Sequence, residues 1–240
     1  MRLQLGRPPL TGCTGRGIRI AVVDSGVHVG HPHIGSVSGG IHVGAIAEDD
    51  DYVDRIGHGT AVCAAIHEKA PNAELFAIKI FDRRLTAGGD VLARAIRYAA
   101  NRGARLVNLS LGTTNAERLD DLRLAVRSAT EAGAVVVAAR EHDGIQWLPG
   151  LLPDVVGVSL DWSMPRHELE IIQQQATTTF RASGYPRPIP GVPHHRNLSG
   201  ISFAVANVTG ILALLIESDP SVRTVADVSR LIDDHATARS

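Results

Sequence analysis

Short apolar runs alternate with longer amphipathic stretches along most of the chain. An apolar, β-branched run at 18–23 is stopped by a polar turn at 24–26, which predicts a buried strand that ends in that turn. Similar runs predict further strands, and apolar residues at helical spacing predict helices. The strands are expected at 74–80, 105–109, 134–139 and 155–160, and the helices at 89–102, 117–131, 202–217 and from 219–220 onwards. This alternation is typical of parallel βαβ units with helices on both faces of a sheet.

The composition supports a folded domain with a sizeable core. Of the 240 residues, 44% are hydrophobic and 20% are charged, which is typical of globular rather than disordered chains. Only 4% are aromatic, so we expect a core built mainly from Val, Ile, Leu and Ala. We predict one domain over 17–238, preceded by an N-terminal extension at 1–16. The stretch 177–200 is rich in Pro, Gly and Thr and predicts loop with a little strand.

Charge, cysteine content and the N-terminal residues limit the partners and the location. The formal net charge is −1 with scattered arginines, which argues against a nucleic-acid partner. Two cysteines, Cys13 and Cys63, are expected to be reduced thiols. The chain starts without the apolar segment of a signal peptide, and no apolar run reaches the roughly 18 residues of a membrane helix. The sequence therefore predicts a cytoplasmic protein with no membrane partner; a processed secreted form and the oligomeric state stay open.

Three short motifs carry the candidate chemistry. Asp24 follows a predicted strand, His58 stands between Gly57 and Gly59 at a helix start, and Ser202 opens the most apolar helix. Taken singly, each is more often structural: a turn residue, a buried histidine or a helix cap. Together they supply a nucleophile, a base and a carboxylate that orients the base. The order Asp, His, Ser differs from the Ser, Asp, His order of α/β-hydrolases.

These motifs resemble those of the subtilisin-like (subtilase) serine proteases. The resemblance covers about 15–235 and rests on the catalytic motifs at 24–26, 58–60 and 200–204. The segment 108–112 resembles the family's substrate-binding strand, and 135–139 resembles the strand before its oxyanion loop.

The resemblance implies a fold, an activity and a set of substrate contacts. It implies a three-layer α/β/α fold with a mostly parallel sheet of about seven strands. It also implies proteolysis of a peptide or protein by an Asp24-His58-Ser202 triad, with the substrate added as a strand. The residues expected to contact the substrate are Ser110, Leu111, Gly112, Ala139, Arg140 and Glu141.

The chain departs from the family pattern after the strand at 134–139. His142 stands where the family has an asparagine that donates to the oxyanion, so His142 is the candidate donor here. Loss of one such donor typically costs about 10²–10³ in turnover, and loss of the nucleophile or base about 10⁶. The departure therefore predicts a weakened enzyme more readily than a dead one. Arg140 and Glu141 replace small pocket residues, and their bulk and charge would change or close that pocket.

No metal or cofactor is predicted. Four histidines, at 28, 31, 33 and 42, fit no common zinc spacing. The acidic stretch 48–54 lacks the glycine and terminal glutamate of a calcium loop, and it predicts a solvated acidic loop. Cys63, on the apolar helix that follows His58, predicts a small buried side chain.

Three functions stay open at this point. The first is a serine endopeptidase that acts on a dedicated peptide or protein. The second, motivated by the altered residues at 140–142, is a weakened or inactive pseudoprotease that binds peptides. The third is a peptide-tailoring enzyme, either a leader peptidase or a macrocyclase, which small size and the absence of a pro-segment before Gly17 would suit.

Overall fold

The computed structural model describes residues 2–44, 47–174, 177–193 and 196–237. One sheet runs through this part of the chain, in the order β1-β10-β11-β9-β7-β6-β2-β5-β3-β4, and β8 pairs with β7. The strands are β1 (Arg2–Gln4), β2 (Arg19–Asp24), β3 (Val37–Val43), β4 (Glu48–Asp49), β5 (Glu74–Lys79), β6 (Leu106–Leu109), β7 (Val135–His142), β8 (Ile145–Gln146), β9 (Val155–Leu160), β10 (Glu168–Gln174) and β11 (Thr177–Ala182). The helices are α1 (His58–Lys69), α2 (Gly89–Asn101), a 3₁₀ turn (Ala116–Arg118), α3 (Leu119–Glu131), α4 (Ile201–Ser218) and α5 (Val225–Thr237).

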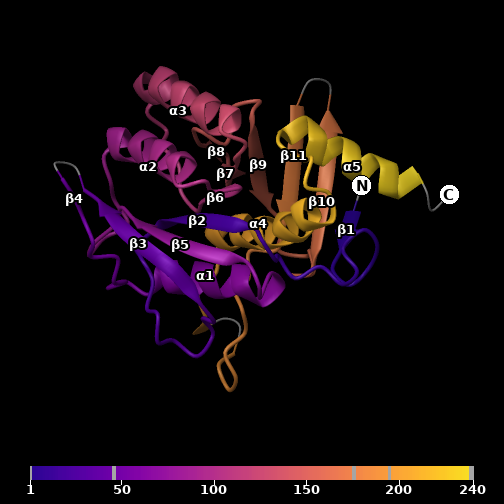
Figure 1. Cartoon of the computed structure of the whole chain (residues 1–240), viewed down its shortest axis with the longest axis horizontal. Coiled ribbons are helices and arrows are strands. Elements are labelled where there is room, and N and C mark those ends of the chain that lie inside the picture. Colours follow the sequence, from indigo (N-terminus) through magenta and orange to yellow (C-terminus); the bar gives the residue numbers. More distant parts are fainter. Residues whose placement is uncertain (1, 45–46, 175–176, 194–195, 238–240) are drawn as a thin grey trace.

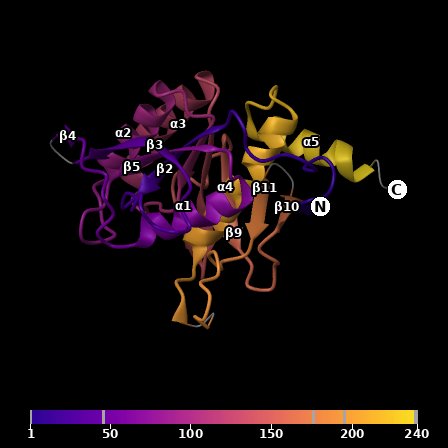
Figure 2. The ribbon, with the colours of Figure 1, turned by 60° about the horizontal axis from the view of Figure 1, so that its bottom comes forward.

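Seven neighbouring strands are mutually parallel, from β3 through β5, β2, β6, β7 and β9 to β11. Helices cover both faces, with α2 and α3 on one and α1 and α4 on the other (Figure 1). The turned view places α1 beside α4 (Figure 2), and the two helices pack against each other. This arrangement confirms the expected three-layer α/β/α architecture with about seven parallel strands.

The core divides at the sheet into two apolar layers. Small and β-branched residues dominate both, because parallel strands buried on two faces leave no polar side. Helix α4 is long and apolar enough to cross a membrane by length and composition, but 78% of its span is buried inside the protein. It is therefore the central helix of one layer.

Three differences from the expected elements have local causes. The last helix begins at Val225, not at 219–220, because Asp219 accepts hydrogen bonds from the backbone and hydroxyl of Ser221 and closes a turn there. Strand β3 was not predicted, because its two glycines interrupt the apolar pattern of the strand. Strand β10 was not expected; it pairs antiparallel with β11, which supplies the little strand predicted within 177–200.

The N-terminal segment packs along the domain. Strand β1 pairs antiparallel with β10. The backbone N–H groups of Thr14 and Gly15 both donate to Glu217 Oε2 at 2.6 Å, near the end of α4. Residues 2–16 thus share the sheet and the core with the region expected to form the domain.

Candidate active site

Asp24 is the last residue of β2, at the carboxyl edge where parallel strands commonly present reactive groups. Its side chain is 1% exposed. Gly26 has φ 98° and Gly59 packs against it so closely that a Cβ on Gly59 would overlap the Gly26 carbonyl oxygen. Only glycine allows this approach. The two glycines therefore bring the turn after β2 against the first turn of α1, which carries His58.

His58 opens α1 and contacts Asp24. The distance from His58 Nδ1 to Asp24 Oδ1 is 2.7 Å. Burial opposes the charged imidazole, but the hydrogen bond and negative charge of Asp24, with the charge of Asp54, outweigh burial and raise the pKa of His58. A carboxylate at Nδ1 favours the tautomer with a proton there, which leaves Nε2 as the acceptor. The ring of Phe203 packs beside the imidazole, with centroids 5.8 Å apart.

Asp54 holds the start of α1 in place. Its Oδ1 accepts from Ser25 Oγ and from the backbone of Ile56 and Gly57, at 2.8–2.9 Å. Its Oδ2 accepts from the backbone and hydroxyl of Thr60, at 2.8 and 2.6 Å. Burial raises the pKa of this carboxyl, but these hydrogen bonds prevail and lower it. The sequence predicted Asp54 to lie in a solvated loop, whereas it is half-buried and holds the start of α1; an acidic residue shortly before a helix start was the signal available.

Ser202 lies in the first turn of α4, two residues after Gly200, whose φ of 144° favours glycine. Its hydroxyl donates to the carbonyl of Ser110 at 3.1 Å. Among the described residues no hydrogen bond joins it to His58, although both side chains line one cavity. Asp24 and His58 therefore meet directly, while Ser202 faces the same space from α4.

A buried polar network fixes α4 against the end of β6. Asn108 Nδ2 donates to Ser110 Oγ at 2.9 Å, and Asn108 Oδ1 accepts from Thr209 Oγ1 at 2.9 Å. Ser110 Oγ in turn donates to the carbonyl of Ser202 at 3.3 Å. Because every member has a partner, the network sets the distance between the strand that carries Ser110 and the helix that carries Ser202.

A cavity of about 220 Å³ contains His58 and Ser202. We call it the Trp147 cavity; its lining residues are His58, Phe81, Leu85, Ser110, Leu111, Gly112, Ala139, Trp147, Ile201 and Ser202. Four of the predicted substrate contacts, at 110–112 and 139, are therefore brought together here. Phe81, Leu85 and Trp147 were missed by sequence reasoning, because an isolated aromatic or leucine gives no local signal of a site.

Trp147 enters the cavity on a hairpin that the family resemblance did not suggest. Strand β7 continues to His142 and turns back through β8. Trp147 N donates to the carbonyl of Arg140 at 2.9 Å, and Leu148 exchanges two backbone hydrogen bonds with Thr113. A Cβ on Gly112 would lie 2.5 Å from Trp147 Cβ. The hairpin therefore fills space between the ends of β6 and β7 and narrows the cavity.

The three residues at 140–142 lie outside the lining of this cavity. Arg140 donates to the carbonyl of Gly150 at 3.4 Å. Glu141 is exposed. His142 packs against Trp162, with ring centroids 6.3 Å apart, and its Nε2 is 3.3 Å from Asp143. The structure thus does not bring these three side chains to His58 and Ser202.

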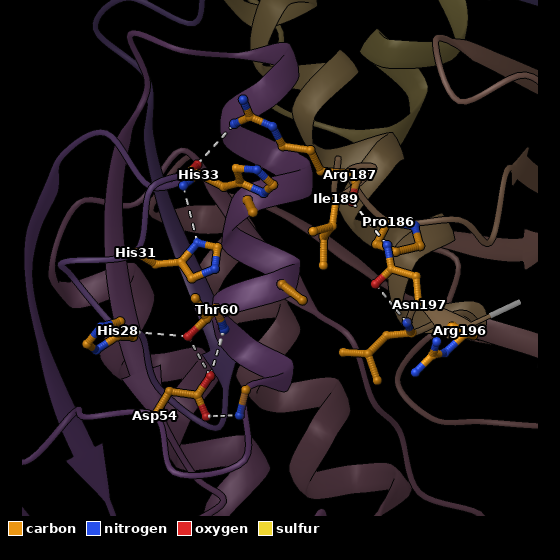
Figure 3. A pocket seen from close by; sticks show the side chains of 14 residues that line it. His28, His31, His33, Asp54, Thr60, Pro186, Arg187, Ile189, Arg196 and Asn197 are labelled. Atoms are coloured by element: carbon orange, nitrogen blue, oxygen red, sulfur yellow. Dashed lines mark hydrogen bonds between the residues drawn. The ribbon is translucent and has the colours of Figure 1, made fainter. Parts of the chain in front are cut away.

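A larger cavity of about 380 Å³ borders α1 on the side of the 27–34 loop (Figure 3). We call it the histidine cavity; its lining residues are His28, His31, His33, Asp54, Gly57, Thr60, Ala61, Ala64, Pro186, Arg187, Ile189, Arg196, Asn197 and Leu198. Within the described ranges no group of three or more His, Cys, Asp or Glu side chains is arranged to hold a metal ion. His42, the fourth histidine of the sequence pattern, instead contacts Asp49 at 3.0 Å.

The cysteines are both free thiols. Cys63 is 1% exposed on α1. Burial, with the nearby charges of Asp24 and Asp54, raises the pKa of the Cys63 thiol. The thiol therefore stays protonated and offers no second nucleophile beside His58.

Known proteins of one family match this chain. Residues 15–141 match the sequence profile of the subtilase family. A thermostable alkaline protease of Halalkalibacterium halodurans is 30% identical over 231 residues, which cover 88% of this chain and 60% of that protein. Subtilisin Savinase of Lederbergia lenta is 30% identical over 223 residues, covering 88% of this chain and 80% of that protein.

A solved structure agrees with the sequence match. Sphericase superposes with a TM-score of 0.68 at 25% identity, over 88% of this chain and 80% of that one. The fold and the aligned relatives define a subtilisin-like serine protease domain. The chain belongs to the subtilase family, and it spans less than two thirds of the length of some relatives that it matches, 60% for the H. halodurans protein.

Proposed function

We propose that this chain is a serine endopeptidase that hydrolyses peptide bonds through Asp24, His58 and Ser202 by way of an acyl-enzyme. The observation that carries the proposal is the 2.7 Å contact between Asp24 and His58 beside a cavity that His58 shares with Ser202. A carboxylate, an imidazole and a hydroxyl at one site are the components of nucleophilic acyl transfer.

The reaction requires the Ser202 hydroxyl to change its hydrogen-bond partner. The Ser202 hydroxyl leaves the carbonyl of Ser110 and donates instead to His58 Nε2. Ser202 Oγ then attacks the substrate carbonyl while His58 takes its proton, and Asp24 stabilises the imidazolium. His58 returns that proton to the departing amine, and the acyl group stays on Ser202. A water molecule, deprotonated by His58, then attacks the acyl carbonyl, and His58 returns the proton to Ser202 Oγ as the acid leaves.

In this proposal, backbone N–H groups stabilise the negative charge of the oxyanion. The N–H of Ser202 lies in the first turn of α4, where helical N–H groups have no acceptor within the helix. The positive end of the α4 dipole points to the same place. His142 remains the sequence-based candidate for a side-chain donor, and it would have to leave Trp162 to act.

The Trp147 cavity supports binding of the acyl half of the substrate. An extended peptide would pair with the backbone at 110–112 as an added strand. Because Trp147 packs on Gly112, the space for a side chain next to the scissile carbonyl is limited. We therefore expect small or medium apolar residues there, and a restricted set of peptide or protein substrates.

A second candidate is a peptide-binding protein with weak or no hydrolysis. It is favoured by the Ser202 hydroxyl, which donates to Ser110 rather than to His58, and by the distance of His142 from the cavity lining. Restoring the family residues with Glu141→Gly and His142→Asn would then raise hydrolysis strongly.

A fluorophosphonate probe separates the two candidates. We expect it to label the native protein at Ser202 and to fail on Ser202→Ala, with digested peptide mapping as the readout. The control is Ser199→Ala, an exposed serine three residues upstream, which should label like the native protein. If well-folded native protein is not labelled and the loop-restored variant is, the peptide-binding candidate is correct.

A further inference from the structure

The histidine cavity is lined by residues that precede and follow His58 in the sequence. Gly57 precedes His58, and Ala61 follows it by three residues on α1, and both line the histidine cavity. Leu198 lines it from the segment that leads to Ser202. The Trp147 cavity instead holds the 110–112 backbone. A peptide that lies across Ser202 with its acyl half at 110–112 would therefore send its leaving half toward the histidine cavity.

The cavity is surrounded by groups that carry or accept positive charge. Two guanidinium groups, Arg187 and Arg196, and three imidazoles line it. Arg187 reaches across one end and donates to the carbonyl of His33 at 3.1 Å (Figure 3). Its positive charge, after burial, lowers the pKa of His33, with His31 adding to the effect and Glu68 opposing it. Such mutual repulsion is relieved when an anion enters.

No carboxylate from the protein neutralises the two arginines in the described part of the chain. Neither Arg187 nor Arg196 forms a salt bridge there. The one carboxylate among the lining residues, Asp54, lies at the opposite end from Arg187 (Figure 3) and accepts the hydrogen bonds that hold the start of α1. The two arginines outnumber it, so the lining carries a net positive charge.

The floor of the cavity is apolar. It is made by Ala61 and Ala64 of α1 and by Pro186, Ile189 and Leu198 of the facing segment. Ile189 and Leu198 are 41% and 47% exposed, so part of this apolar surface is open to a ligand. Aliphatic groups would pack on the floor, and a terminal anion would reach the rim.

We propose that the histidine cavity binds a carboxylate carried by the leaving half of the substrate, within the first two residues after the scissile bond. This inference rests on the proposed function. The carboxylate is that of a Glu or Asp side chain or of the peptide's own C-terminus. Among side chains, Glu fits better than Asp because its longer stem covers the apolar floor. Lys and Arg are disfavoured by Arg187 and Arg196.

A cleavage-site profile tests the preference. Native protein is incubated with a peptide library, and the products are sequenced by mass spectrometry. At the first or second position after the cut we expect Glu over Gln by about fivefold at low salt, a range typical of partly exposed charge pairs. Salt at about 0.5 M should reduce the preference through screening. A Glu-to-Gln ratio near one would overturn the inference.

Two arginine variants locate the effect. Arg196→Glu should reverse the preference toward Lys, because Arg196 is exposed and its side chain forms no salt bridge with the described residues. Its matched control is Arg97→Glu, which makes the same charge change on the exposed side of α2 and should leave the profile unchanged. Arg187→Gln should lower the Glu preference while keeping a donor for the His33 carbonyl. Unchanged profiles in both cavity variants would contradict the assignment.

A second pair of peptides identifies the source of the carboxylate. Peptides that end two residues after the cut are compared as free acids and as amides, with neutral side chains in the leaving half. Faster cleavage of the acid assigns the cavity to the C-terminal carboxylate. Equal rates, together with a Glu preference within long peptides, assign it to a side chain.

Binding without cleavage separates this inference from the proposed function. Ser202→Ala protein is titrated calorimetrically with the amide-capped peptides Glu-Ala-Leu and Gln-Ala-Leu. Preferential binding of the Glu peptide, with no probe labelling of native protein, would sink the proposed function and keep the carboxylate site. If the native protein is labelled and cleaves peptides, but Ser202→Ala protein binds both peptides with equal affinity, the carboxylate site is wrong and the proposed function stands.

Discussion

Two cavities lie beside the start of α1, and they differ in charge. The Trp147 cavity, about 220 Å³, is lined by uncharged apolar residues together with His58, Ser110 and Ser202, and is bounded by the ends of neighbouring strands in the sheet. The histidine cavity, about 380 Å³, combines an apolar floor with basic side chains at its rim, and is bounded by α1 and by residues at 28–33, 186–189 and 196–198. The segment after β11 projects from the body beside α1 (Figure 2). The shape of the Trp147 cavity is thus set by packed strands, whereas that of the histidine cavity is set largely by loops. Loops tolerate more sequence variation than strands, so we expect substrate preference to be determined mainly at the histidine cavity.

The comparison of the two cavities assumes that His58 and Ser202 carry out the chemistry on a peptide that occupies both. Ser202→Ala and His58→Ala should each lower kcat by about 10⁶, and Asp24→Asn by about 10⁴, the costs found when triad members are removed elsewhere. Hydrolysis of a fluorogenic peptide measures the loss, with Ser199→Ala as control. Peptide binding to both cavities should survive in Ser202→Ala. A loss below about tenfold would place the chemistry elsewhere.

Enlarging the smaller cavity should change selectivity more than rate. We expect Trp147→Ala to raise the preference for Phe over Ala, at the residue that donates the carbonyl, by about tenfold or more, as pocket-size changes do in other enzymes. Competition between two peptides that differ only at that residue gives the ratio of kcat/KM. Trp162→Ala is the matched control, since Trp162 packs on Tyr185 and lines neither cavity. An equal shift in both variants would point to a general loosening of the fold.

The pH profile reports how strongly Asp24 acts on His58. Catalysis needs the neutral imidazole, and Asp24 raises the pKa of His58. The acid limb of kcat/KM should therefore lie above the usual histidine value of about 6.5, with about a tenfold loss for each pH unit below it. In Asp24→Asn the limb should move to lower pH. A limb that stays in place in that variant would mean that another group titrates.

The smallest effect is expected at His142. With its ring packed on Trp162, His142→Ala should change kcat by about threefold or less, against the 10²–10³ that loss of an oxyanion donor costs. Single-turnover kinetics on one peptide decides between these values. A loss in the larger range would show that His142 moves to the cavity during catalysis.

The sequence predicted the parts of the structure that have local periodicity. Helices α2, α3 and α4 and strands β2, β5, β6 and β9 lie within about two residues of their expected bounds. Strand β3 was missed because its glycines interrupt the apolar run, and β10 because the buried Leu169 and Ile171 alternate with half-buried residues, two of them glutamates. These strands are stabilised by pairing across the sheet, which no local window contains.

The candidate site divides in the same way. Asp24, His58 and Ser202 were found because each sits in a motif of adjacent residues. Trp147 was not, since its partner Gly112 is 35 positions away in the printed sequence and nothing beside it marks the contact. The 140–142 segment was aligned to a loop, whereas the chain continues there as strand and hairpin. The residues at 140–142 thus differ from the family pattern in backbone path as well as in side chain.

The attachment of the first residues to Glu217 has a practical consequence for producing the protein. Starting the polypeptide at Gly17 would remove the two N–H donors of Glu217 and expose the edge of β10 that β1 now covers. An uncovered strand edge invites association with other chains. Shortened versions should therefore aggregate on purification, and affinity tags belong ahead of Arg2 or after the last helix, never in place of the leading segment.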